Sequence, residues 1–369
     1  MNPLTKSLSR RRFLQASAGT AAAVALGGMS TASRVVAQDA PSGTFNWMTW
    51  SDHFFARQLE DVTAATSITP SISELAGNAE GYTRLVEVGG QLDMISGDAL
   101  WVPKYHADGL IEAWDINELE VAKDLYSIAR EFEIWTTPEG YLGFPFGWSP
   151  VQIYYDPAQV SPAPDSWEVL LDPKYAGRVM TENQPEEIPA YMGKFIGAVD
   201  PYDMTPEELA QATEAMRRLK PNVLRLAQQN TDTISALANG EVWLATGNLG
   251  TDERVLEAGG PQLAFFTPKE GTIGWMDAEM IVKGGANAAL IRPWLEAAER
   301  PEYIAQNFLD YGRPLFNESA YKVLVDDGHQ ERADRYLYNK PETVLTMTLK
   351  GPSPSTGDAI SAFNEVFGA

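Results

Sequence analysis

The 369-residue chain contains no cysteine and only three histidines, His53, His106 and His329. The missing cysteines exclude disulfides, thiol nucleophiles, iron–sulfur clusters and thiolate zinc sites. The histidines are too far apart in the sequence for a local metal-binding motif, so we expect no metal and no cofactor. Phosphate-loop, nucleophile-elbow and HExxH patterns are also missing, which argues against an enzyme.

Basic residues are scarce beside acidic ones: Lys and Arg number 28, Asp and Glu number 50, and the formal net charge is −22. A surface of this sign repels the phosphate backbone of nucleic acids and anionic membranes, and it keeps a protein soluble. We therefore expect no nucleic-acid partner. Small cations are a compatible class of ligand, although surface charge by itself is weak support for them.

The N-terminal segment has the order of a bacterial export signal. Ser9-Arg10-Arg11-Arg12-Phe13-Leu14 fits the twin-arginine pattern, an apolar stretch of mostly small residues runs from Ala16 to Met29, and Val35-Val36-Ala37 offers a cleavage site. The apolar stretch is too short to span a bilayer as an anchor. We predict that residues 1–37 are a twin-arginine signal peptide and that the exported chain works in the periplasm.

After residue 37 the chain alternates short apolar strands with helical stretches. We predict strands at 44–50, 92–96, 151–155, 241–246 and 262–267, and helices at 54–65, 205–219 and 288–312, the last of them broken near Pro301. Thr205, Pro206 and Glu208 form a strong helix start, with a capping residue, a first-turn proline and a capping box. This alternation predicts an α/β fold with largely parallel sheets. Because no soft linker separates the two halves, we expect the chain to cross between two lobes more than once.

Acidic and tryptophan side chains follow several of the predicted strands, where open α/β sheets bind their ligands. The residues found there are Trp50, Ser51, Asp52, His53, Asp98, Glu186, Glu187, Trp275 and Asp277. Ordinary surface loops rarely contain tryptophan, so we expect a ligand cleft. Other roles stay open: the tryptophans could belong to the core, and the acids could cap helices or lie at solvated helix starts.

Several segments resemble the spermidine- and putrescine-binding proteins of ABC importers, a branch of the periplasmic solute-binding superfamily. The resemblance rests on Trp50-Ser51-Asp52, residues 91–96, Asp165-Ser166-Trp167, residues 173–177, Pro185-Glu186-Glu187, residues 237–242 and, most closely, the stretch from Pro268 to Asp277. It extends over nearly the whole chain after the signal, and its motifs are more specific for the branch than for the ligand.

The resemblance implies a two-lobed, type II-like periplasmic binding protein with the ligand cleft between its lobes. We predict a first lobe from residues 38–148 plus 276–319 and a second lobe from residues 149–275 plus 320–369. The expected partners are a small amine, such as putrescine or spermidine, and the membrane subunits of an ABC importer. The protein is expected to be a monomer.

In the implied site, aromatic rings stack on the aliphatic amine and carboxylates meet its ammonium groups. An ammonium over an indole face gains about 0.5–2 kcal/mol, whereas burial of an unpaired ion costs several kcal/mol. Asp98 adds an acid where the family has a serine. The family's binding roles fall on Trp50, Ser51, Asp52, Glu187, Trp275, Asp277 and Tyr311.

Three residues depart from the family pattern: His53 replaces a tyrosine, Asn248 replaces a tryptophan, and Thr251 stands where putrescine-type members carry an acid, although Asp252 is adjacent. In addition, Arg313 follows Tyr311 closely. An arginine in the cleft favours a ligand with a carboxylate, so a zwitterion such as an ω-amino acid is the alternative ligand. Arg313 could instead form an ion pair on the surface or between the lobes. We expect His53 to be partly exposed at a helix start.

Two further functions receive less support. The adjacent tyrosines Tyr154 and Tyr155 resemble those of ferric-ion-binding relatives, but they lie within an apolar strand, where at least one is expected to face the core. A periplasmic enzyme would have to rely on a carboxylate pair in the cleft, as glycosidases do.

Overall fold

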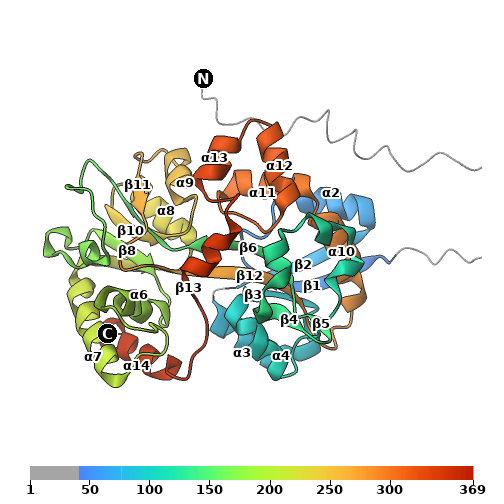
Figure 1. Ribbon diagram of the computed structural model, residues 1–369, viewed down its shortest axis with the longest axis horizontal. Helices are drawn as coiled ribbons and strands as arrows, with labels where there is room; N and C mark the ends of the chain where they lie inside the picture. The colour runs from blue at the N-terminus through green and yellow to red at the C-terminus, as the bar shows by residue number, and fades with distance from the viewer. Residues whose placement is uncertain (1–40, 76, 369) are drawn as a thin grey trace, which may run out of the picture.

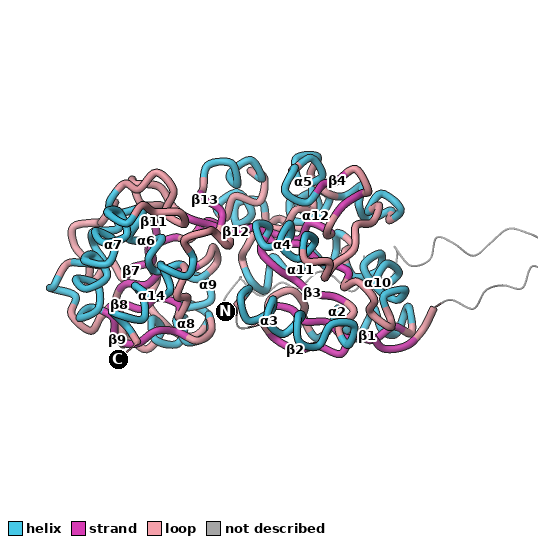
Figure 2. The backbone as a smooth tube through the Cα atoms, turned by 90° about the horizontal axis from the view of Figure 1, so that it is seen from below, coloured by secondary structure: helices cyan, strands magenta, loops and turns pink. Residues whose placement is uncertain are grey.

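The computed structural model describes residues 41–75 and 77–368. The predicted signal peptide, residues 1–37, lies outside the described residues. Within those two ranges, no helix combines the length and the apolar character needed to cross a membrane. The described chain forms two main sheets with helices packed around them, and the two sheets lie side by side (Figures 1 and 2).

The first sheet has six strands, in the order β13, β12, β3, β1, β2, with β6 also paired to β12. Their bounds are β1 Gly43–Thr49, β2 Ile68–Glu74, β3 Met94–Asp98, β6 Phe144–Pro150, β12 Ile273–Ile281 and β13 Thr348–Leu349. β1 is parallel to β2 and β3, whereas β12 runs antiparallel to β3 and β6. The carboxyl end of β3 therefore meets the middle of β12.

The second sheet has five strands in the order β11, β7, β10, β8, β9. Their bounds are β7 Gln152–Tyr155, β8 Val179–Glu182, β9 Val223–Ala227, β10 Leu244–Gly247 and β11 Ala264–Phe266. β8 is parallel to β9 and β10, whereas β7 is antiparallel to β10 and β11. Both sheets are mixed: five strand pairs are parallel and four are antiparallel, so the prediction of largely parallel sheets holds only in part. Strand direction depends on which partner a strand meets in space, and hydrophobic periodicity carries no information about that.

The helices divide into three groups by their packing (Figure 1). With the first sheet lie α2 Ala56–Thr66, α3 Asn78–Val88, α4 Val102–Ala107, α5 Ser127–Glu131 and α10 Ile291–Ala298; with the second lie α6 Glu187–Ile196, α7 Pro206–Leu219, α8 Asn230–Ala238, α9 Thr251–Glu257 and α14 Thr356–Phe367. The third group, α11 Pro301–Tyr311, α12 Glu318–Asp326 and α13 Gln330–Arg335, packs in sequence order. β4 Thr136–Thr137 and β5 Gly140–Tyr141 form a separate two-stranded sheet, and Tyr141 packs against the apolar cluster of the first sheet.

The predicted start of α7 is confirmed. The Glu208 N–H donates to Thr205 Oγ1 at 3.2 Å, and the Thr205 N–H donates to Glu208 Oε2 at 2.8 Å. Pro206 occupies the first turn, where its missing N–H costs no hydrogen bond. The predicted break near Pro301 is confirmed as well, since α10 ends at Ala298 and α11 begins at Pro301.

The chain passes between the sheets more than once. It leaves the first sheet between β6 and β7, returns between β11 and β12, and leaves again after β13 to reach α14, which packs on α6 and α7. Gly250 and Gly312, both with positive φ, meet where α9 begins and α11 ends. A Cβ on Gly312 would lie 2.6 Å from the Gly250 Cα, so this close backbone approach requires glycine.

Separate apolar clusters stabilise the two sheets. Trp47, Trp148 and Trp294 belong to the cluster of the first sheet, whereas Trp167 and Tyr191 belong to that of the second. The α/β fold with two sheets agrees with the alternation of strands and helices in the sequence. The predicted lobe boundaries, 38–148 plus 276–319 and 149–275 plus 320–369, stay a prediction. After residue 319, α12 packs against α11 and β13 pairs with β12, whereas α14 packs against α7.

Candidate functional site

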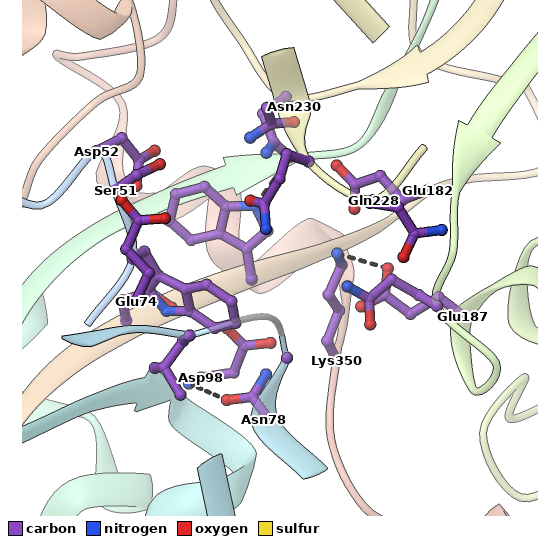
Figure 3. Close-up of a pocket in the computed structure, with 18 of the residues that line it drawn as sticks. Ser51, Asp52, Glu74, Asn78, Asp98, Glu182, Glu187, Gln228, Asn230 and Lys350 are labelled. Atoms are coloured by element: carbon purple, nitrogen blue, oxygen red, sulfur yellow. Dashed lines mark hydrogen bonds and ion pairs between the residues drawn. The ribbon is translucent and has the colours of Figure 1, made fainter. Parts of the chain in front are cut away.

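A cavity of about 330 Å³ lies between the two sheets (Figure 3). Its volume is within the usual range for small-molecule sites. Segments far apart in the sequence line it: the turn after β1, the end of β3, the start of α3, the middle of β12, the start of α6 and the residue after β13. Acids dominate its charged lining residues, which are Asp52, Glu74, Asp98, Glu182, Glu187 and Asp277 against Arg254 and Lys350.

Two indole rings, Trp50 and Trp275, line the cavity. Trp50 follows β1 as predicted. Trp275 does not follow a strand: it and Asp277 lie inside β12, where residues two apart share a face. The Trp275 indole N–H donates to Asn248 Oδ1 at 2.9 Å, which brings the predicted residue Asn248 to the cavity wall.

The carboxylates of Asp98 and Asp277 belong to directly paired residues of β3 and β12. Their exposed fractions are only 6% and 4%. Like charges directly opposite each other across two strands repel, and burial together with the Asp277 charge raises the pKa of Asp98 well above its ordinary value. Asp277 Oδ1 is buried and has no hydrogen-bond partner within the described part of the chain. The pair therefore suits a shared proton or a cationic donor.

His53 lies behind Asp277, outside the set of residues that line the cavity. It is 2% exposed, so the expectation of a partly exposed residue at a helix start is wrong. Its ring nitrogens contact Asp277 Oδ2 at 3.0 Å and Glu279 Oε1 at 2.6 Å, and the ring stacks on Phe146. Burial alone would lower the pKa of His53, but the two carboxylates raise it to about 9. The imidazolium therefore orients Asp277 from the side away from the cavity.

Arg313 is a buried cation that pairs with Asp52, as His53 pairs with Asp277. Its guanidinium Nε donates to Asp52 Oδ2 at 2.7 Å, its Nη2 donates to the Asp52 carbonyl at 2.5 Å, and the side chain is 2% exposed. Burial by itself raises the pKa of Asp52, but Arg313 and His53 lower it to about 2. Arg313 does not line the cavity, so the alternative of an ion pair describes it better than a clamp on a ligand carboxylate.

Of the other two predicted residues of this region, Ser51 lines the cavity and Tyr311 does not. The Tyr311 hydroxyl donates to the Phe54 carbonyl at 3.0 Å and thereby ties α11 to the turn after β1. Its ring borders a more open hollow of about 400 Å³ together with Arg254 and Asp310.

On the side of the second sheet, Glu187 begins α6 and points toward Lys350 (Figure 3). Lys350 Nζ lies 2.6 Å from Glu187 Oε2, and the Tyr191 hydroxyl donates to the same oxygen at 3.2 Å. Glu182, at the end of β8, lines the cavity beside this pair. Burial and the Glu187 charge raise the pKa of Glu182, although Lys350 opposes the shift.

Several residues that line the cavity were not predicted from the sequence. Gln228, Gln229 and Asn230 follow β9, so the rule that ligands bind beyond strand ends could have found them. Lys350 carried no such signal: it reaches the cavity because β13 pairs with β12, where the Lys350 N–H donates to the Gly274 carbonyl at 2.8 Å. Asn78 also lacked a signal, and its Oδ1 accepts from the Asp98 N–H at 3.0 Å.

These residues can hold a small organic cation between acids, indole rings and amides. Among the described residues, no group of three or more histidine, aspartate or glutamate side chains is arranged to hold a metal ion. Tyr154 and Tyr155 are both buried, and the Tyr154 hydroxyl donates to the Asn248 carbonyl at 2.8 Å. Their burial leaves little support for a ferric-ion site.

The family described as bacterial extracellular solute-binding proteins matches residues 85–331 of the chain. The spermidine/putrescine-binding periplasmic protein of Escherichia coli (strain K12) is 26% identical over 307 residues, which cover 82% of this chain and 85% of that protein. The resemblance to this branch, stated above from short motifs, is thereby confirmed over most of the chain.

Solved structures share the fold. The spermidine/putrescine substrate-binding protein of Streptococcus pneumoniae, in complex with calcium and HEPES, has a TM-score of 0.70 at 19% identity, covering 88% of this chain and 98% of that one. A periplasmic binding protein of A. tumefaciens B6, in complex with glucopine, has a TM-score of 0.69 at 17% identity, covering 88% of this chain and 99% of that one. The predicted periplasmic binding protein fold is confirmed, and a fold that holds such different molecules does not select a ligand.

Proposed function

The chain belongs to the family of bacterial extracellular solute-binding proteins, and we propose that its ligand is a small organic amine held in the cavity between the two sheets. It is a solute-binding protein of an ABC transporter rather than an enzyme. The membrane subunits of the importer are the expected partners. We also propose that it works in the periplasm, in line with the predicted export signal in residues 1–37 and the periplasmic relative from Escherichia coli.

The observation that carries the amine proposal is the pair of buried carboxylates, Asp98 and Asp277, at the cavity wall. One Asp277 oxygen has no partner in the described part of the chain, and the other is held by His53. An ammonium group placed here replaces the repulsion between the acids with two charge-assisted hydrogen bonds. Burial and the Asp277 charge favour the protonated form of Asp98, so we expect the binding of an ammonium to release a proton.

The two indole rings support the same class of ligand. Trp50 and Trp275 line the cavity with the acids, and an ammonium or the methylenes beside it pack well on such faces. A hard metal cation such as Ca²⁺ is bound by several converging oxygen ligands, whereas these rings provide apolar surface. Asp52, fixed in its ionised state by Arg313, adds a further negative charge to the wall.

The zwitterionic alternative has lost its original support, because Arg313 is buried against Asp52. Arg254 is the remaining guanidinium at the cavity, and it lies 5.8 Å from the centre of the Tyr311 ring. It lies within electrostatic reach of Asp52, which would also repel a ligand carboxylate. An ω-amino acid therefore belongs in the test but is not the proposal.

Isothermal titration calorimetry with putrescine, spermidine, 4-amino-1-butanol and 4-aminobutanoate at moderate salt tests the proposal. We expect at least one of the three amines without a carboxylate to bind with micromolar or better affinity, roughly −8 kcal/mol. We also expect protons to be released on binding, measurable as a dependence of the heat on the ionisation enthalpy of the buffer. Preferential binding of 4-aminobutanoate would instead assign a zwitterion.

The variant Asp277→Asn is the matching genetic test. It keeps a hydrogen-bonding group for His53 but removes the charge, so amine affinity should fall by about 100-fold or more, because a buried ion loses its partner. The melting temperature should fall only moderately, because Glu279 still pairs with the His53 imidazolium. Asp165→Asn, at an exposed ion pair with Lys269, is the control and should bind like the wild type. If the heat of binding is the same in Asp277→Asn as in the wild type, and the same for every amine tested, the cavity is not an amine site.

A further inference from the structure

Lys350 places a cation of the protein itself inside the proposed amine site. Its backbone is fixed beside Trp275 through the hydrogen bond to the Gly274 carbonyl, and its side chain extends across the cavity to Glu187 (Figure 3). Lys350 and Glu187 are only 8% and 6% exposed. The ion pair therefore connects the edge of the first sheet to the first turn of α6, beside the second sheet.

The position of Lys350 changes the charge that each side of the cavity offers. On the side of the first sheet, the counter-cations His53 and Arg313 do not line the cavity, whereas the acids that they contact, Asp277 and Asp52, do. On the other side, the counter-cation is in the cavity and contacts Glu187 directly. Burial alone would lower the pKa of Lys350, but the charges of Glu187 and Glu182, and more weakly that of Asp98, raise it above its ordinary value, so the ammonium stays protonated.

We propose that Lys350 occupies the place of a second ligand ammonium, so that this site takes an amine with one cationic group and an uncharged polar end. This inference rests on the proposed function and narrows it. A second ammonium near Glu187 would meet the Lys350 ammonium at close range, and repulsion between two buried cations is strong. The diamine would have to displace an ion pair that is already formed.

The remaining residues of that side fit an uncharged end. Gln228, Gln229, Asn230 and Thr231 line the cavity there and provide neutral donors and acceptors. A ligand carboxylate would face Glu182 and Glu187, and Lys350 is already engaged. A hydroxyl or amide group can bond to these side chains without bringing a charge.

The test is the ratio of affinities for two ligands of equal length, putrescine (1,4-diaminobutane) and 4-amino-1-butanol. Both affinities are measured by calorimetry with the wild type and with Lys350→Met. The wild type should prefer the amino alcohol. In Lys350→Met the Glu187 carboxylate becomes free for a second ammonium, so the ratio should shift toward the diamine by at least about tenfold. The ratio compares two ligands on one protein, so any general loss of stability cancels.

Three further variants make the outcome decisive. Lys350→Arg keeps the cation and should keep the wild-type ratio, and Lys194→Met, on α6 but outside the cavity lining, should change nothing. Lys350→Gln is a second neutral variant, and it is sufficient alone if the methionine variant does not fold. An unchanged ratio in both neutral variants overturns the role of Lys350 while amine binding stands. Failure of every protein to bind either ligand or spermidine overturns the amine proposal itself.

Discussion

The two sides of the cavity differ in where their counter-cations lie. On the side of the first sheet, Arg313 and His53 contact Asp52 and Asp277 from outside the cavity lining, and both cations are 2% exposed. On the side of the second sheet, Lys350 contacts Glu187 from within the lining. A hidden cation, meaning one that pairs with a lining carboxylate but does not itself line the cavity, orients that carboxylate and leaves one side of it for a ligand. A cation that lines the cavity competes with the ligand for the carboxylate.

This difference shows that a count of acids is a poor guide to ligand charge. The acidic lining residues outnumber the basic ones, which taken alone favours a polycation. The partners of each acid, and the direction from which they approach, decide which acids remain available. By that criterion, the side with Asp98 and Asp277 is the end of the site that binds the ammonium group of the ligand.

Removing the hidden cation Arg313 should have the largest effect. Arg313→Ala leaves the Asp52 carboxylate partly buried without its partner, so the free energy of unfolding should fall by about 3–5 kcal/mol. Urea denaturation followed by circular dichroism measures it. The control is Arg225→Ala, which breaks an exposed pair with Glu241 near the second sheet and should cost less than about 1 kcal/mol. Equal losses in the two variants would contradict the hidden role of Arg313.

The second prediction concerns the charge of His53. Its folded-state pKa of about 9 lies above the ordinary value of 6.5, so the stabilisation is fully present below about pH 6.5 and is lost as the pH rises through about 9. The total is roughly 3 kcal/mol. An NMR titration of the histidine rings should show one imidazole still protonated at pH 8, and His53→Gln should remove that signal.

Two controls belong to the histidine experiment. Burial lowers the pKa of His329, so its ring should titrate below the ordinary range in the same spectra. Glu299, whose pKa burial raises to about 8, also reduces stability as the pH rises, and Glu299→Gln separates that contribution. A His53 ring that titrates near 6.5 would mean that Asp277 is not held by an imidazolium.

The smallest effect is expected for an indole ring of the cavity. Trp50→Leu keeps apolar volume but removes the π face, so amine affinity should fall by about 0.5–2 kcal/mol, or roughly 2- to 30-fold. Trp243→Leu is the matched control, because Arg178 lies 4.7 Å above that ring, outside the cavity lining. Equal calorimetric affinities for Trp50→Leu and the wild type would remove Trp50 from the ligand's surroundings.

Much of the cavity lining was predictable because local rules reach the ends of strands. Trp50, Ser51, Asp52 and Asp98 follow β1 and β3 or end them, and a strand-end rule needs only the sequence around each strand. The resemblance pointed to Trp275 and Asp277 although they lie within β12. Their roles as ligand contacts stay predictions, as does that of Glu187, until binding is measured.

The partners of these residues could not be predicted in the same way. His53 and Asp277 are 224 positions apart, and Arg313 and Asp52 are 261 apart. A charge in the sequence does not reveal which opposite charge it will meet after folding. The alternative of an Arg313 clamp failed for this reason, and Lys350, far from every recognised motif, was missed.

The sequence by itself determined the α/β alternation, the capped start of α7, the family resemblance and most of the acids and tryptophans of the cavity. It could do so because periodicity, caps and strand ends are local properties. Only the tertiary structure decided the direction of β12, the face-to-face acids Asp98 and Asp277, and the side from which each counter-cation approaches. Those features depend on contacts between distant segments, and burial gives each contact its energetic weight.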